Sequence, residues 1–180
     1  MRQVLVLSGG HPYEEAPFAQ LLASLAGWQV THLIHPQAEE AVAQGAAEAA
    51  AAILLYDMPG YTFADGKATT RPPSDGFKAA IRAHFAAGKG AVAWHHAIAG
   101  WAEWPEWAAM VGGRFLYQPG PVRKGANGIP MPDSGYRHDV AYTAEVMADH
   151  PVTAGLPATF ELCDELYLAP VFEASVQPLL

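Results

Sequence analysis

The chain has 180 residues, of which 51% are hydrophobic and 16% charged, so it has the material for one folded domain with a buried core. Eighteen acidic residues against ten basic ones give a formal net charge of −8, and no basic run is long enough to follow a phosphate backbone. We therefore expect neither nucleic acid nor a membrane as a partner.

Cysteine use and the N-terminal pattern bear on the compartment. Cys163 is the only cysteine, which excludes an intramolecular disulfide and a thiolate metal cage. The apolar residues 4–7 end at Ser8-Gly9-Gly10, before the apolar core of a signal peptide would be complete. No segment is long enough to span a membrane. These features predict a cytoplasmic location.

Four segments have strand patterns. Residues 4–7, 53–56 and 91–94 are short runs that are apolar without interruption, as in parallel strands covered by helices on both faces. Residues 28–34 predict a further strand. Polar residues interrupt that segment, so we expect it near an edge of the sheet.

Helical patterns alternate with these strands. Apolar residues recur with helical spacing over 18–25, 77–85 and 104–111, and each stripe is followed by glycine. His84 falls on the apolar side of its helix, so we expect a structural role for it. Residues 38–52 are rich in alanine and predict another helix from propensity alone.

Two segments lack a regular pattern. Residues 59–76 and 112–138 are rich in glycine and proline, and connections of this length inside a domain are lids, binding loops or hairpin excursions. The β-α order elsewhere predicts an α/β fold with a doubly wound, mainly parallel sheet. We find no linker, so residues 1–180 are expected to form a single domain.

Chemically versatile residues follow three of the predicted strands. Gly9, Gly10 and His11 come after the first, Asp57 after the third, and His95-His96 after the fourth. Ligands of open α/β sheets bind beyond the carboxyl ends of the strands, so these residues are expected to converge on one crevice. One imidazole of the adjacent pair should face the crevice while the other packs beneath it.

Each of these residues also has a structural interpretation. Gly9-Gly10 fits an anion or sugar hydroxyl, or simply a strand-to-helix turn. His11 fits a ligand or general base, or a group that binds a turn carbonyl. Asp57 fits an orienting group for histidine or a turn residue. Trp101 belongs to a tryptophan-rich segment in which core packing and one sugar platform are both open.

Several motifs resemble the ThuA-like domain, a family linked to trehalose utilisation. Together with Gly9-Gly10-His11 they cover most of the chain. They are GKGAVAWHHA at 88–97, Trp101, Trp104, GGRF at 112–115, HPVTAGL at 150–156, Phe160, and DELY at 164–167.

The resemblance implies a flavodoxin-like fold related to class I glutamine amidotransferases. It also directs attention to Asp164 and Glu165 as site residues. Amidotransferases carry a nucleophilic Cys at a strand end, where this chain has the Trp94-His95-His96 segment, so Cys-dependent glutamine hydrolysis is not expected. The family pattern has a further glycine-rich strand segment beyond the position where this sequence ends, so we expect either a short version of the domain or an absent terminal piece.

Three functions remain open. The first is a carbohydrate-active enzyme for trehalose, a related disaccharide or a keto-sugar, with His11, His95, His96 and Glu165 as catalytic groups. Gly9, Gly10, Asp57, Trp101 and Asp164 would bind the substrate. The second is a hydrolase dependent on zinc or another divalent metal held by His11, His96 and Glu165. The third is a non-catalytic sugar-binding module. The sequence leaves open whether the chain forms a homo-oligomer.

Overall fold

The computed structural model describes residues 1–117, 134–172 and 174–180. The chain divides into two compact units, Met1–Val111 and Gly112–Leu180, and each is described by itself. That all 180 residues act as a single domain stays a prediction.

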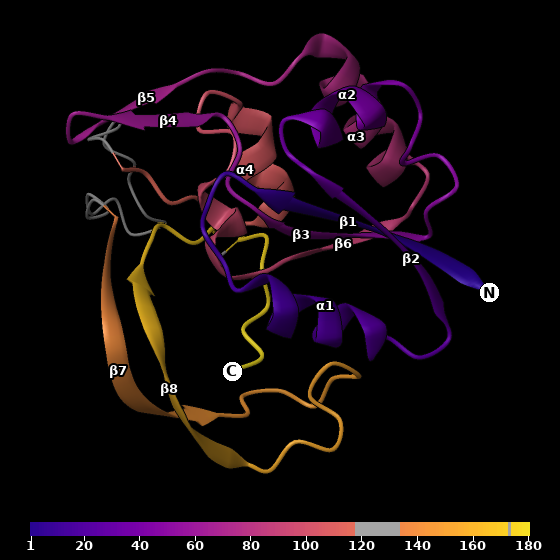
Figure 1. Cartoon of the computed structure of the whole chain (residues 1–180). Helices are drawn as coiled ribbons and strands as arrows, with labels where there is room; N and C mark the ends of the chain where they lie inside the picture. The colour runs from indigo at the N-terminus through magenta and orange to yellow at the C-terminus, as the bar shows by residue number, and fades with distance from the viewer. Residues whose placement is uncertain (118–133, 173) are drawn as a thin grey trace. The chain divides into compact units, whose positions relative to one another are not determined.

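A four-stranded parallel sheet forms the centre of the first unit (Figure 1). Its strand order is β2-β1-β3-β6, and each neighbouring pair is parallel. The strands are β1 (Arg2–Gly9), β2 (Trp28–Ile34), β3 (Ala52–Asp57) and β6 (Gly90–Ala93). All four predicted strands are therefore confirmed, and β2 lies at an edge as its polar residues indicate.

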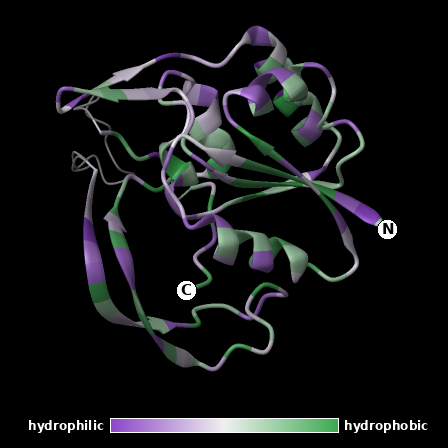
Figure 2. Cartoon of the chain, in the orientation of Figure 1, coloured by the Kyte–Doolittle hydropathy of each residue, from purple (hydrophilic) through white to green (hydrophobic). Residues whose placement is uncertain are grey.

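Helices cover both faces of this sheet (Figure 1). Successive side chains of a strand point to opposite faces, so each apolar strand contributes to a core on either side. On one face, Val4 and Val6 pack with Phe18 and Leu22 of α1. The other face packs on the remaining helices. Hydrophobic residues run along β1 and β3 in Figure 2, as burial on both faces requires. The helices are α1 (Glu15–Ala23), α2 (Gln37–Ala43), α3 (Asp75–Ala86) and α4 (Pro105–Val111).

One predicted segment differs from the structure. The helix predicted over 38–52 is too long, because α2 ends at Ala43 and Gly45 adopts φ +104°. The chain then turns so that Ala51 N donates to Gln3 O at the start of the sheet. Alanine propensity is a weak preference, and the return to the sheet overrides it.

The irregular segment 59–76 is a hairpin excursion, one of the three forms expected for it. It contains the antiparallel strands β4 (Tyr61–Ala64) and β5 (Lys67–Thr70), and then α3 begins at Asp75. Asp65 and Gly66 form the turn, both with positive φ. Of the other predicted loop, 112–138, residues 118–133 lie outside the described part.

The second unit is built on an antiparallel pair, β7 (Gly135–Glu145) and β8 (Thr159–Leu168). The loop between them is ordered by Thr153, whose hydroxyl donates toward Ala148 O at 2.8 Å and accepts from His150 N at 3.2 Å. None of the helices in the described ranges is long and apolar enough to cross a membrane.

Candidate functional site

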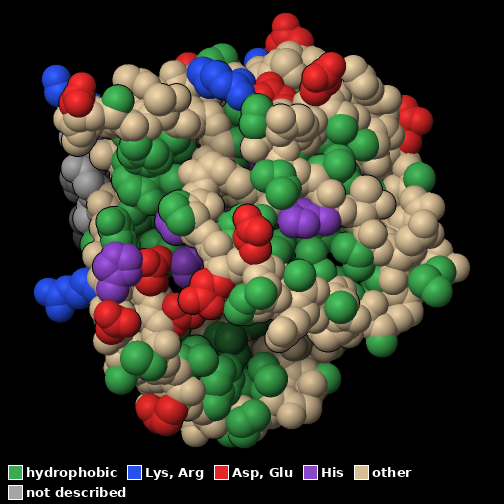
Figure 3. Space-filling view, in the orientation of Figure 1, with side chains coloured by type: hydrophobic (Ala, Val, Ile, Leu, Met, Phe, Trp, Pro, Cys, Tyr) green, Lys and Arg blue, Asp and Glu red, His purple; other side chains and the backbone are tan. Residues whose placement is uncertain are grey.

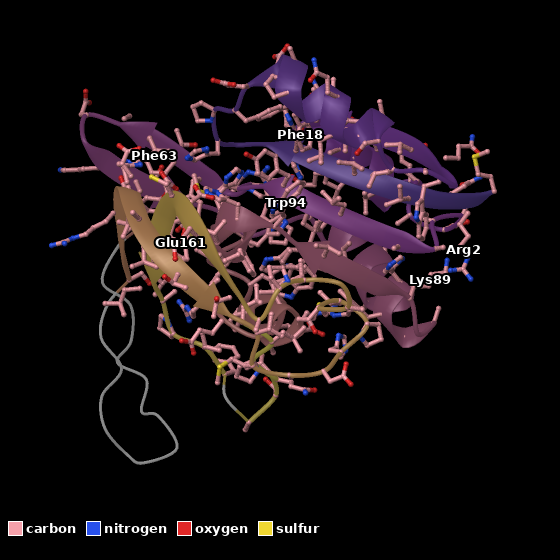
Figure 4. The ribbon with its side chains drawn as sticks, turned by 90° about the horizontal axis from the view of Figure 1, so that it is seen from below. Arg2, Phe18, Phe63, Lys89, Trp94 and Glu161 are labelled. Atoms are coloured by element: carbon pink, nitrogen blue, oxygen red, sulfur yellow. The ribbon has the colours of Figure 1, made fainter. Side chains whose placement is uncertain are left out.

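The carboxyl ends of the parallel strands lie at one end of the first unit. In Figure 4, Arg2 and Lys89 mark the amino ends of β1 and β6, and Trp94 marks the carboxyl end of β6. His11 follows β1, Asp57 ends β3, and the pair His95-His96 follows β6. Topology therefore delivers the predicted residues to the same edge of the sheet.

Two glycines let the loop after β1 pass close to β3. Gly9 and Gly10 have φ +101° and +80°, values that favour glycine. A Cβ on Gly10 would lie 2.3 Å from Met58 O, closer than any real contact. Met58 N also donates to Gly9 O at 2.9 Å. The absence of a side chain at Gly10 therefore allows the chain leading to His11 to pass close to the end of β3.

His11 is held in a defined tautomer by its neighbour. Its Nδ1 lies 2.8 Å from Pro12 O, and because a carbonyl only accepts, Nδ1 carries the proton. In a neutral imidazole, Nε2 is then the deprotonated nitrogen. The side chain is half-buried, so this nitrogen has the form a general base requires.

The pair after β6 begins with strained backbone. His95 has a φ of +54°, a backbone conformation that residues other than glycine rarely adopt. It is the first residue of the short 3₁₀ helix η1 (His95–Ala99). Such strain persists where surrounding structure enforces it, often at functional sites. His95 is half-buried and His96 is 3% exposed, as expected for one imidazole facing outward and one packing beneath.

The imidazoles from the two loops meet. The His11 and His96 rings stack with centroids 4.3 Å apart, and Tyr56 of β3 lies 4.6 Å from His96. His95 Nδ1 lies 3.2 Å from His96 Nδ1. A hydrogen bond between two Nδ1 atoms needs one proton, so one ring donates and the other accepts. Histidine side chains are visible among hydrophobic ones on the surface drawn in Figure 3.

Asp57 faces the opposite side of the sheet from Tyr56 and binds a histidine that the sequence analysis did not single out. His35 Nε2 donates to Asp57 Oδ2 at 2.9 Å, and both side chains are almost fully buried. Burial raises the pKa of Asp57, although the hydrogen bond from His35 works against this. His35 directly follows β2, so the strand-end rule that selected the other residues would have found it too.

Trp101 lies in the core next to this pair. It is 1% exposed, its ring lies 5.2 Å from Phe77 and 5.8 Å from His35, and Arg71 lies over its face. A sugar platform needs an accessible ring face, so the observed packing favours the structural interpretation. His84 is also structural, since its Nε2 donates to Gly90 O while the ring is buried.

Asp164 and Glu165 belong to β8 in the second unit. Glu165 accepts a short hydrogen bond from Tyr167 OH, and His138 Nδ1 lies 2.5 Å from its other carboxylate oxygen. Burial, followed by this carboxylate, raises the pKa of Tyr167. Asp164 Oδ1 accepts from Glu165 N at 2.8 Å. Glu165 is thus a hydrogen-bonded acceptor within its own unit.

The residues named for a metal are divided between the two units, His11 and His96 in the first and Glu165 in the second. Within residues 1–117, 134–172 and 174–180, no group of three or more His, Cys, Asp or Glu side chains is arranged to hold a metal ion.

Comparison with protein families decides the relationship. A family model described as trehalose utilisation, ThuA, matches residues 3–180. The chain belongs to the ThuA family. A search of curated proteins and a search of solved structures found no significant match. The ThuA match covers both units, so the strand-end histidines of the first and the acidic pair of the second both lie within the family region.

Proposed function

We propose that this ThuA protein binds a carbohydrate of trehalose utilisation at the carboxyl edge of its sheet and exchanges protons with it through His11, His95 and His96. The stacked imidazoles of His11 and His96, brought together from loops after β1 and β6, carry the proposal. Loops at this edge are where ligands of open α/β sheets bind.

The tautomers support an acid and a base in one cluster. His11 holds its proton on Nδ1, so Nε2 is available to accept one. The hydrogen bond between the Nδ1 atoms of His95 and His96 contains one proton, which either ring can donate. A group that accepts and a pair that shares a proton are what a proton-transfer reaction near neutral pH requires.

The chemistry of these groups favours an oxidised sugar over direct cleavage of a glycosidic bond. Most glycosidases use two carboxyl groups about 5–10 Å apart. At this edge of the first unit, Asp57 is buried and bound to His35. Imidazoles instead suit removal of a proton next to a carbonyl, as in a keto-sugar. Glu165 and Asp164 remain candidates for substrate contacts.

Two further candidates follow from other expectations. A divalent metal would supply a Lewis acid if His11 and His96 were joined by a carboxylate such as Glu165. A non-catalytic module would keep the crevice and bind sugar without turnover. Metal analysis of the purified protein, together with activity after chelation, separates the first of these from the lead proposal.

The deciding experiment titrates trehalose and a keto-derivative of trehalose by calorimetry and follows turnover of both by NMR. We expect binding of at least one, lost in His11→Ala and retained in His150→Ala, a histidine of the second unit. Binding without turnover would favour the sugar-binding module. Failure of the wild-type protein to bind either compound would contradict the proposal.

We also infer that the sheet belongs to a doubly wound, flavodoxin-like fold of the class I glutamine amidotransferase type. The order β2-β1-β3-β6 with helices on both faces supports this. So does the strained turn at His95, which follows a strand as a nucleophile elbow does but carries imidazole in place of thiol. An experimental structure tests the fold, and cell fractionation tests the expected cytoplasmic location.

A further inference from the structure

Tyr13 lies in the same loop as His11 and binds the sheet through its hydroxyl. Tyr13 OH is 3.0 Å from Ser8 Oγ, and Ser8 Oγ is 2.7 Å from His32 Nε2. Ser8 is completely buried. A buried hydroxyl is tolerated when it is hydrogen-bonded, and this one has a partner on each side.

The side chains of His32, Ser8 and Tyr13 can form both hydrogen bonds at once, each proton having one donor and one acceptor. Burial lowers the pKa of His32, which favours its neutral form at neutral pH. A neutral Nε2 can accept from Ser8, and Ser8 can then accept from Tyr13. The chain His32–Ser8–Tyr13 therefore links β2, β1 and the loop after β1 through side chains.

The ring of Tyr13 also closes a circuit of aromatic contacts. The ring centroids of Tyr13 and Tyr56 are 5.6 Å apart, those of Tyr56 and His96 are 4.6 Å apart, and His96 stacks on His11 at 4.3 Å. His11 thus contacts His96, Tyr13 contacts Tyr56, and His96 and Tyr56 contact each other. Upstream of His11 the loop has only glycine, at positions 9 and 10, so no side chain anchors it from that direction.

We propose that Tyr13 is a positioning residue for His11. Its hydrogen bond to Ser8 holds the loop so that the His11 ring stays on His96 with its proton on Nδ1. The catalytic relevance of this arrangement rests on the proposed function, in which His11 transfers protons. The arrangement itself can be tested without any substrate.

The experiment is NMR of the imidazole nitrogens in protein labelled with ¹⁵N-histidine, with the His11 signals identified by their loss in His11→Ala. The wild type should show His11 with its proton on Nδ1. Tyr13→Phe keeps the ring and removes the hydroxyl, and it should give His11 nitrogen shifts averaged between tautomers. Tyr142→Phe, in the second unit, is the matched control and should leave His11 unchanged.

Ser8→Ala breaks the same link from the other side and should reproduce the Tyr13→Phe spectrum. The double variant should be no further displaced than either single one, because both remove one interaction. If Tyr13→Phe melts lower but leaves the His11 nitrogen shifts unchanged, Tyr13 is structural only and the inference is wrong. If Tyr13→Phe does not fold, Ser8→Ala decides in the same way.

Trehalose titration separates this inference from the proposed function. If the wild type binds trehalose, Tyr13→Phe should weaken binding by roughly fivefold, the equivalent of one ordinary hydrogen bond. If the wild type binds neither trehalose nor its keto-derivative, the proposed function fails, and the nitrogen shifts still decide the role of Tyr13.

Discussion

His11 and His96 stack their imidazole rings with centroids 4.3 Å apart and planes inclined by 23°. One ring follows the first strand of the sheet and the other follows the last, so no local pattern in the sequence brings them together. This relationship makes the pair the first target for mutation.

Removing each of these rings should have different effects on stability. His11→Ala should abolish ligand binding and change the free energy of unfolding by no more than about 1 kcal/mol, because the side chain is half-exposed. His96 is 3% exposed, so His96→Ala should abolish binding and also cost about 1–3 kcal/mol. Urea unfolding with calorimetry measures both. A His11→Ala protein that is strongly destabilised yet still binds ligand would place His11 in the core.

Trp107→Ala should give the opposite pattern. Trp107 is 2% exposed and stacks on Trp104 at 5.7 Å within the core cluster. Truncation should cost roughly 3–5 kcal/mol, because the buried area is lost and a cavity remains. Ligand affinity measured below the melting temperature should stay close to that of the parent. A small loss of stability would show that this helix packs less tightly than its burial indicates.

Gly10→Ala tests the close approach of the two strand ends. In the present conformation the added Cβ would lie 2.3 Å from Met58 O, and alanine would have to adopt a φ of +80°. The loop must therefore move. We expect loss of ligand binding and destabilisation well beyond about 1 kcal/mol. Gly66→Ala is the matched control, since Gly66 has φ +70° with nothing within 4 Å. It should cost about 1 kcal/mol from backbone strain alone. Equal losses in both variants would refute the steric argument.

The buried carboxyl of Asp57 should make stability depend on pH. Its pKa in the folded protein is raised above the ordinary value of 3.8, chiefly by burial. As pH rises past that value, the unfolded chain releases its proton first, so the contribution of Asp57 to stability falls until the folded carboxyl ionises as well. Asp57→Asn removes this titration. The free energy of unfolding of the wild type minus that of the variant should therefore fall as pH rises from about 4, and a rising difference would contradict the assignment.

Alkaline titration tests the contact between Glu165 and Tyr167. Burial and the adjacent carboxylate both raise the pKa of Tyr167, so Glu165→Gln should lower it by removing the charge while burial remains. Ultraviolet absorbance of tyrosinate follows the change. Glu161→Gln on the same strand, where Thr143 is the partner, is the control and should leave Tyr167 unaltered. An unchanged titration in Glu165→Gln would mean that burial alone sets this pKa.

The sequence was enough to predict the parallel strands. Residues buried on both faces must be apolar without interruption, as in β1 and β3, and the polar residues of β2 indicate a strand at an edge. The sequence also determined which residues reach the carboxyl edge, since a parallel sheet puts all strand ends of one kind on one side. His11, Asp57, His95 and His96 could be predicted on that ground alone. The motifs spread along the chain, from Gly9-Gly10-His11 to residues 164–167, indicated the family that the family model then matched.

Which of these residues are in contact depends on the packing of the whole fold. Adjacent residues on a strand face opposite sides, so Tyr56 joins the histidine stack while Asp57 turns to His35 on the other face. Propensity could not end α2 at Ala43, because the return to β3 is a constraint of the whole sheet. Nor could spacing show that Ser8 joins Tyr13 to His32, since a hydrogen bond between three elements depends on packing that no single segment contains.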